Sequence, residues 1–216
     1  MDYSYQAILF DCDGVIVDTE TLSNNIMKSM LADLGLELDS DVLHEKFSGF
    51  TTKSNLATAT KMLGRPLPDT FQADYKARFK QHIEKHLEPI EGVVDLLQRI
   101  QCPIAMATNA NRAEMNEKLS KIGLINTFSV RFALDDVANG KPAPDLYLKA
   151  AEALGVQPKD CLVIEDSIAG IKAGKAAGMT VFAYCGSMDA KKQTEAGASV
   201  CFKTMYELIE LLKLKP

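Results

Sequence analysis

The chain has 216 residues, 47% of them hydrophobic and 25% charged, which is the usual balance of a protein that folds around an apolar core. It carries 24 Lys and Arg against 29 Asp and Glu, and the resulting net charge of −5 argues against nonspecific binding to nucleic acid. No run approaches the roughly 18 apolar residues of a membrane span, so we expect no membrane partner.

Short apolar runs alternate with stretches of helical periodicity through most of the chain. The apolar runs predict strands at 7–10, 103–108, 129–133, 161–164, 180–184 and 198–202. Helical spacing predicts helices at about 91–100, 111–122, 144–155, 167–177 and 204–214. This alternation favours an α/β fold, a Rossmann-like parallel sheet with helices on both faces. Right-handed crossovers then place the carboxyl ends of all strands along one edge.

Residues 19–88 interrupt this alternation. They contain no convincing strand, and glycine and proline separate their helical stretches. The helices are expected at about 20–34, 39–47, 53–63 and 70–86. We therefore expect a catalytic core formed by residues 1–18 and 89–216, with residues 19–88 inserted as a helical cap. The charges of this insert nearly balance, so it is not a basic clamp.

Polar side chains gather where the predicted strands end. In an open α/β sheet, ligands bind beyond the carboxyl ends of the strands. The candidates there are Asp11 and Asp13 after the first strand, Thr108 and Asn109 after the second, Lys141 in a loop, and Glu165 and Asp166 at the end of the strand at 161–164. We expect all of them along one edge of the sheet.

These residue types together can transfer a phosphoryl group. Crowded carboxylates repel one another unless a cation or a proton lies among them, and hard oxygen ligands suit Mg²⁺ better than zinc. One carboxylate can attack phosphorus to form an aspartyl phosphate, while a second protonates the leaving oxygen and later deprotonates the attacking water. Lys141 and Thr108, with nearby backbone N–H groups, can hold the phosphoryl oxygens.

Four motifs, taken together, resemble those of the haloacid dehalogenase superfamily of phosphotransferases. They are Asp11-x-Asp13-Gly14-Val15-x-x-Asp18, Thr108-Asn109, Lys141-Pro142-x-Pro144-Asp145 and Glu165-Asp166-Ser167-x-x-Gly170. The resemblance implies that Asp11 is the nucleophile and Asp13 the general acid and base. It also implies that Thr108, Asn109 and Lys141 bind the phosphoryl group. The Mg²⁺ ligands implied are Asp11, the backbone carbonyl of Asp13 and Asp166, with Glu165 as a ligand or beside one.

The insert resembles the small cap of β-phosphoglucomutase-like sugar phosphatases. Its loop at 48–53 looks like the substrate-specificity loop of that group, so Gly49, Thr52 and Lys53 are candidates for contact with the substrate. The mutases carry a histidine where Ser23 aligns and an arginine where Thr52 aligns. These two departures favour a phosphatase of a small sugar phosphate or phosphogluconate-like metabolite.

Two alternatives remain open at this point. One is a β-phosphoglucomutase-type phosphotransferase that works from a phosphorylated Asp11. The other is a non-catalytic phospho-aspartate signalling module, although such modules lack a helical insert of about 70 residues and place their acid pair and accepting aspartate at different strand ends.

The chain has five cysteines, an odd number, and most of them lie in or beside apolar runs. This pattern is typical of reduced cysteines in a protein core. We expect a cytoplasmic monomer whose partner is a small phosphorylated substrate.

Overall fold

The computed structural model describes residues 5–47, 52–186 and 188–215. The chain divides into two compact units. The core unit consists of Met1–Asp18 and Glu88–Pro216, and the helical unit is Thr19–Leu87. Glu88 belongs to the core unit, where its carbonyl accepts a hydrogen bond from the N–H of Asp18.

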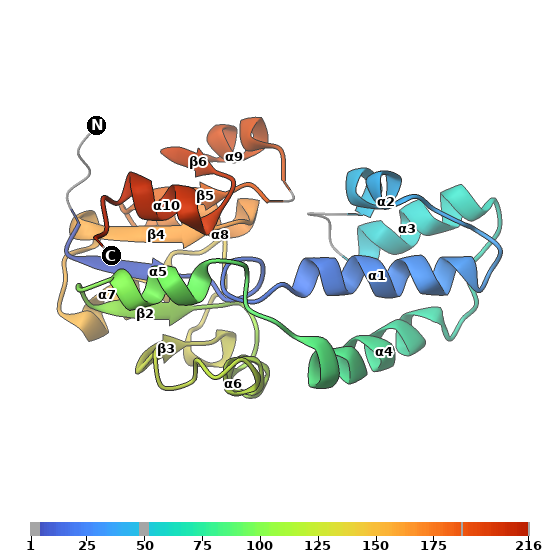
Figure 1. Ribbon diagram of the computed structural model, residues 1–216, viewed down its shortest axis with the longest axis horizontal. Helices are drawn as coiled ribbons and strands as arrows, with labels where there is room; N and C mark the ends of the chain where they lie inside the picture. Colours follow the sequence, from blue (N-terminus) through green and yellow to red (C-terminus); the bar gives the residue numbers. More distant parts are fainter. Residues whose placement is uncertain (1–4, 48–51, 187, 216) are drawn as a thin grey trace. The chain divides into compact units, whose positions relative to one another are not determined.

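Within the described residues, the core unit contains one parallel sheet of six strands (Figure 1). The strands are β1 (Ala7–Phe10), β2 (Ile104–Ala107), β3 (Val130–Phe132), β4 (Cys161–Glu165), β5 (Thr180–Tyr184) and β6 (Val200–Phe202). Their order is β3-β2-β1-β4-β5-β6. Every residue of β1 and β4 is buried, as expected for strands covered on both faces. The predicted α/β fold with a parallel sheet is confirmed.

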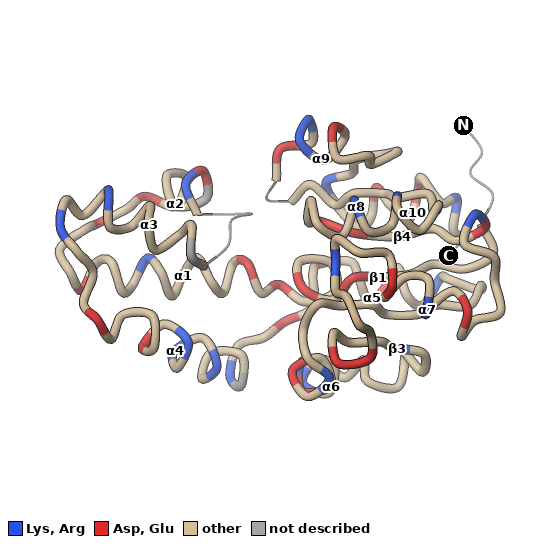
Figure 2. The backbone as a smooth tube through the Cα atoms, turned by 180° about the vertical axis from the view of Figure 1, so that it is seen from behind, with Lys and Arg blue, Asp and Glu red and all other residues tan. Residues whose placement is uncertain are grey.

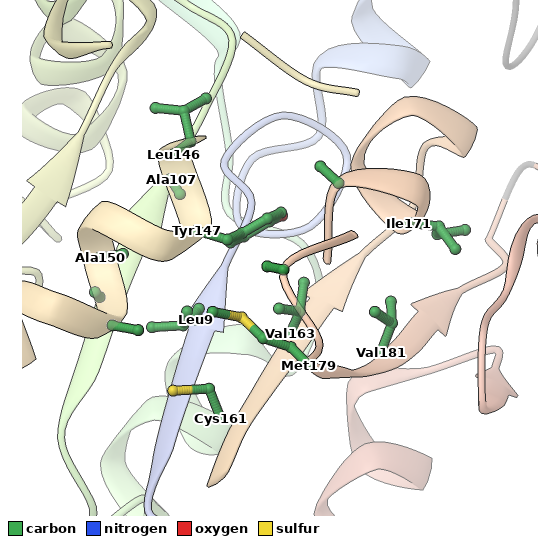
Figure 3. Close-up of a cluster of buried hydrophobic side chains, with 14 of the residues drawn as sticks. Leu9, Ala107, Leu146, Tyr147, Ala150, Cys161, Val163, Ile171, Met179 and Val181 are labelled. Atoms are coloured by element: carbon green, nitrogen blue, oxygen red, sulfur yellow. The ribbon is translucent and has the colours of Figure 1, made fainter. Parts of the chain in front are cut away.

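Helices cover both faces of this sheet. The helices of the core unit are α5 (Val93–Arg99), α6 (Arg112–Lys121), α7 (Asp145–Leu154), α8 (Ile168–Ala176), α9 (Ala190–Ala196) and α10 (Met205–Leu211), with 3₁₀ turns η1 (Leu134–Asp136) and η2 (Pro158–Asp160). Figure 3 shows α7 and α8 packed on one face through a buried cluster that includes Leu9, Val163 and Ile171. Helices α5 and α10 contact each other and lie over the opposite face in Figure 1.

Helix α9 is absent from the elements expected from the sequence, and that omission was wrong. The helix has only seven residues, so it is too short to show an apolar period. Local signals for it are nevertheless present, because the side chain of Asp189 caps its first turn and Gly197 ends it in the left-handed conformation.

The described residues of the helical unit contain four helices and no strand, as expected from the sequence. They are α1 (Thr19–Ala32), α2 (Ser40–Phe47), α3 (Thr52–Leu63) and α4 (Phe71–His86). Helix α1 packs on α4 and α2, and α2 packs on α3. Figure 2 shows charges of both signs along α2 and α4, whereas α3 carries lysine but no acidic residue. None of the helices seen in the described part of either unit has the length and hydropathy needed to span a bilayer.

Candidate active site

The strand order identifies where the core unit can bind a ligand. From β1 the chain builds the sheet outward through β2 and β3 on one side, and through β4, β5 and β6 on the other. Such a reversal leaves a crevice at the carboxyl ends of the two central strands. Asp11 follows β1 directly, and Glu165 is the last residue of β4. The pairing of Phe10 with Ile164 brings these two carboxylates to the same level of the sheet.

Lys141 joins the two carboxylates. Its Nζ donates to Asp11 Oδ1 at 2.5 Å and to Glu165 Oε1 at 2.6 Å. Its side chain is only 3% exposed, and Glu165 is fully buried. A cation held between two buried carboxylates offsets their mutual repulsion. The structure therefore brings together three of the site residues predicted from separate motifs.

Burial and charge shift the pKa values of this group in different directions. Burial raises the pKa of Asp11 to about 7, although the Lys141 ammonium acts to lower it. Burial would also raise the pKa of Glu165, but Lys141 and several hydrogen bonds outweigh that effect and hold it below its usual value. The two carboxylates in turn hold the pKa of Lys141 well above its usual value despite burial. Lys141 is thus a cation in this site.

Glu165 also organises the turn that follows β4. Its Oε1 accepts a second hydrogen bond, from the hydroxyl of Tyr147 at 2.9 Å. Its Oε2 accepts from the N–H groups of Asp166 and Ser167 and from the Ser167 hydroxyl, each at 3.0 Å. A Cβ atom at Gly170 would lie 1.6 Å from Glu165 Oε1, so only glycine leaves room for this arrangement. Both carboxylate oxygens of Glu165 are therefore occupied by groups of the protein.

Three carboxylates lie close enough to share one metal ion. One oxygen from each of Asp11, Glu165 and Asp166 lies within 4.8 Å of the others. Gly14 adopts a φ of 78° and leaves space for Asp166, whose Oδ2 would lie 2.1 Å from a Cβ atom there. All of these donors are oxygen atoms, and such a set fits Mg²⁺ better than a softer metal.

Thr108 and Asn109 follow β2 and make different contacts. Thr108 is buried, and its Oγ1 accepts from the N–H of Ala110 at 3.1 Å. The Asn109 side chain forms hydrogen bonds with both backbone groups of Lys141, donating to its carbonyl at 3.1 Å and accepting from its N–H at 2.8 Å. The Asn109 side chain therefore holds the loop that carries Lys141.

Asp13 forms an ion pair that the sequence interpretation missed. Lys118 on α6 donates from Nζ to Asp13 Oδ1 at 2.6 Å. The sequence does contain a signal for it, because Lys118 lies on the buried stripe of α6 with Met115 and Leu119. A lysine on an apolar stripe usually requires a partner.

Two more contributors, Tyr147 and Gln193, were also missed. Tyr147 follows the Lys141 motif on α7, and its pKa is raised well above the usual value by burial and by Glu165. Gln193 lies on α9 and is fully buried. Its Nε2 donates to the carbonyls of Asp166, which directly follows β4, and of Tyr184, the last residue of β5.

Three candidates for contact with the substrate lie in the insert. Thr52 is exposed at the start of α3. Gly49 lies outside the described residues, and so does the side chain of Lys53. Ser23, where the mutases carry histidine, forms a 2.6 Å hydrogen bond with the hydroxyl of Tyr75 inside the helical unit.

Comparison with known proteins gives a consistent family. Residues 8–184 match the family described as haloacid dehalogenase-like hydrolase. The chain is 31% identical over 183 residues to a 6-phosphogluconate phosphatase of Escherichia coli, covering 83% of this chain and 82% of that protein. It is 30% identical over 214 residues to a phosphorylated carbohydrates phosphatase of Thermotoga maritima, covering 96% and 98%. A crystal structure of a hydrolase from Deinococcus radiodurans, with bound phosphate and sodium, is 32% identical over the full length of both chains, with a TM-score of 0.87.

Proposed function

Because this chain belongs to the haloacid dehalogenase-like hydrolases, we propose that it is a Mg²⁺-dependent phosphatase of a small phosphorylated metabolite, such as a sugar phosphate or a phosphogluconate-like acid. The enzyme class predicted from the sequence, a phosphoric monoester hydrolase, is confirmed by the phosphatase relatives. The observation that carries the proposal is the buried group of Asp11, Lys141 and Glu165 at the carboxyl ends of β1 and β4. The related Deinococcus hydrolase also contains bound phosphate, the product expected of a phosphatase.

Asp11 and Asp166 are the side chains that would hold the metal, together with the backbone carbonyl of Asp13. The contacts of Glu165 favour a different role, because both of its oxygens already accept hydrogen bonds from the protein. Bound Mg²⁺ would withdraw charge from the phosphoryl oxygens. Glu165 would hold Lys141 and the turn at Asp166 in place.

The reaction that we propose takes place in two steps on Asp11. In the first, a carboxylate oxygen of Asp11 bonds to phosphorus as the bond to the leaving oxygen breaks, and Asp13 gives a proton to that oxygen. In the second, Asp13 takes a proton from water, which attacks phosphorus and releases inorganic phosphate and free Asp11. Lys141 and the hydroxyl of Thr108 would bind the transferring oxygens, since a hydroxyl that accepts one hydrogen bond can still donate its own proton.

We propose that the helical unit selects the substrate, with Thr52 and Lys53 among the residues that contact it. The mutase alternative is disfavoured at Ser23, because a hydroxyl bonded to Tyr75 cannot supply the acid–base chemistry of an imidazole. A test for interconversion of sugar phosphates, primed with a bis-phosphorylated sugar, would detect mutase activity if it exists.

Phosphate release from a panel of sugar phosphates, phosphogluconate, nucleotides and an aryl phosphate tests the proposal. We expect release by the wild type with Mg²⁺, loss with EDTA and loss in Asp11→Asn. Glu152→Gln, a change of an exposed carboxylate on α7, is the control and should retain activity. Release that persists undiminished in Asp11→Asn would exclude this residue as the nucleophile.

A further inference from the structure

Lys118 lies in the interior of the core unit and faces Asp13. Its side chain is 9% exposed, and its Nζ lies 2.6 Å from Asp13 Oδ1. Burial alone would lower the pKa of Lys118, but the charge and hydrogen bond of Asp13, together with Cys12 and Glu114, raise it. The two residues are 105 positions apart in the chain, so their contact depends on how α6 packs beside the loop after β1.

Packing alone does not account for a lysine at this position. Its neighbours on the buried stripe of α6 are Met115 and Leu119, and an apolar side chain of similar length would continue that stripe. Replacing a buried ion pair by apolar residues is often neutral or stabilising, so such a pair is weak evidence for a role in stability. What Lys118 adds is a donor that holds one oxygen of Asp13.

We propose that Lys118 is a positioning residue for proton transfer by Asp13. With Oδ1 held by Lys118, Oδ2 is the oxygen that exchanges a proton with the leaving group and later with water. An unrestrained carboxylate would rotate about its terminal torsion, which has broad minima. This inference rests on the proposed function, in which Asp13 is the general acid and base.

Two substrates with different leaving groups separate this role from a structural one. An alkyl phosphate requires its leaving oxygen to be protonated, whereas p-nitrophenyl phosphate releases a stable phenolate. The kcat/KM value reports the steps up to formation of the phosphoenzyme. We expect Lys118→Met to lower kcat/KM for a sugar phosphate about 10- to 100-fold, the range typical when a partner that orients a metal ligand is lost. The value for p-nitrophenyl phosphate should change much less.

Further variants complete the experiment. Lys118→Arg keeps a charged donor and should recover most of the loss on the sugar phosphate. Lys121→Met, an exposed lysine on the same helix, should change neither substrate. In the background of Asp13→Asn, Lys118→Met should have no further effect on the sugar phosphate. If Lys118→Met does not fold, Lys118→Gln, which keeps a neutral donor, replaces it in the experiment. Circular dichroism verifies the folding of each variant.

The outcomes distinguish the two hypotheses. A wild type that releases no phosphate from either substrate would refute the proposed function and this inference with it. If the wild type is active and Lys118→Met lowers kcat/KM equally for both substrates, or for neither, the positioning role is refuted while the proposed function stands. A leaving-group-dependent loss recovered by arginine establishes it.

Discussion

Replacing Gly14 by alanine tests how closely the carboxylate of Asp166 packs against the turn that follows β1. Gly14 has a φ of 78°, where an L-residue with a Cβ is strained by about 1–2 kcal/mol. The new Cβ would lie 2.1 Å from Asp166 Oδ2, whereas a carbon–oxygen contact settles at about 3.3–3.6 Å. The carboxylate must therefore withdraw by more than about 1 Å, far beyond the roughly 0.2 Å that metal-ligand distances tolerate.

We expect Gly14→Ala to reduce both the free energy of unfolding and the affinity for Mg²⁺. The backbone strain and the displaced carboxylate should together lower stability by more than about 2 kcal/mol. Displacement of one ligand should weaken Mg²⁺ binding by at least about 10-fold. Urea unfolding measures the first effect, and isothermal titration calorimetry with Mg²⁺ measures the second without relying on turnover.

Gly178 provides the matched control. Its φ is 76°, but no atom lies within 4 Å of the position that a Cβ would take. Gly178→Ala should therefore show the backbone strain alone, about 1–2 kcal/mol, with unchanged Mg²⁺ affinity. If the two variants lose the same stability and both keep wild-type Mg²⁺ affinity, the close approach of Asp166 to Gly14 has no functional consequence and the reasoning is wrong.

Three further predictions concern the surroundings of the site. Gln193→Leu removes the donor shared by two backbone carbonyls, so the free energy of unfolding measured in urea should fall by about 1–3 kcal/mol. Amide hydrogen exchange should also become faster in the loops after β4 and β5. Unchanged exchange would show that Gln193 does not hold these loops. Tyr147→Phe removes one hydrogen bond to Glu165 and should lower the free energy of unfolding by about 1.5–3 kcal/mol. A decrease of less than about 0.5 kcal/mol would show that this hydrogen bond is dispensable for stability. Burial, with a smaller effect of Asp160, raises the pKa of Cys161 to about 11. Iodoacetamide at pH 8 should therefore label this thiol only after the protein unfolds. If Cys161 in the native protein is labelled as fast as in the unfolded protein, this prediction is wrong.

The main strands and the acidic residues that follow them were readable from the chain alone. The run Ala7–Phe10 is wholly apolar and ends at Asp11, so both the strand and the position of the first carboxylate follow from neighbouring residues. The helical periodicity of residues 19–88 likewise predicted helices, and four are present in the described part of this segment. These features are local, because burial on both faces of a strand and the period of a helix act over a few residues.

Strand order and the contacts of the site required the tertiary structure. Nothing in the chain near Asp11 indicates that β4 rather than another strand pairs with β1, and this pairing brings Glu165 to the level of Asp11. Lys141 reaches both carboxylates from a loop that Asn109 holds after β2. Short α9 was missed together with Gln193, since seven residues carry too little periodicity. The motif residues indicated which chemistry was available. Their mutual distances depend on long-range packing. Only the folded chain therefore shows that Lys118 donates a hydrogen bond to Asp13, and that both oxygens of Glu165 accept hydrogen bonds from the protein.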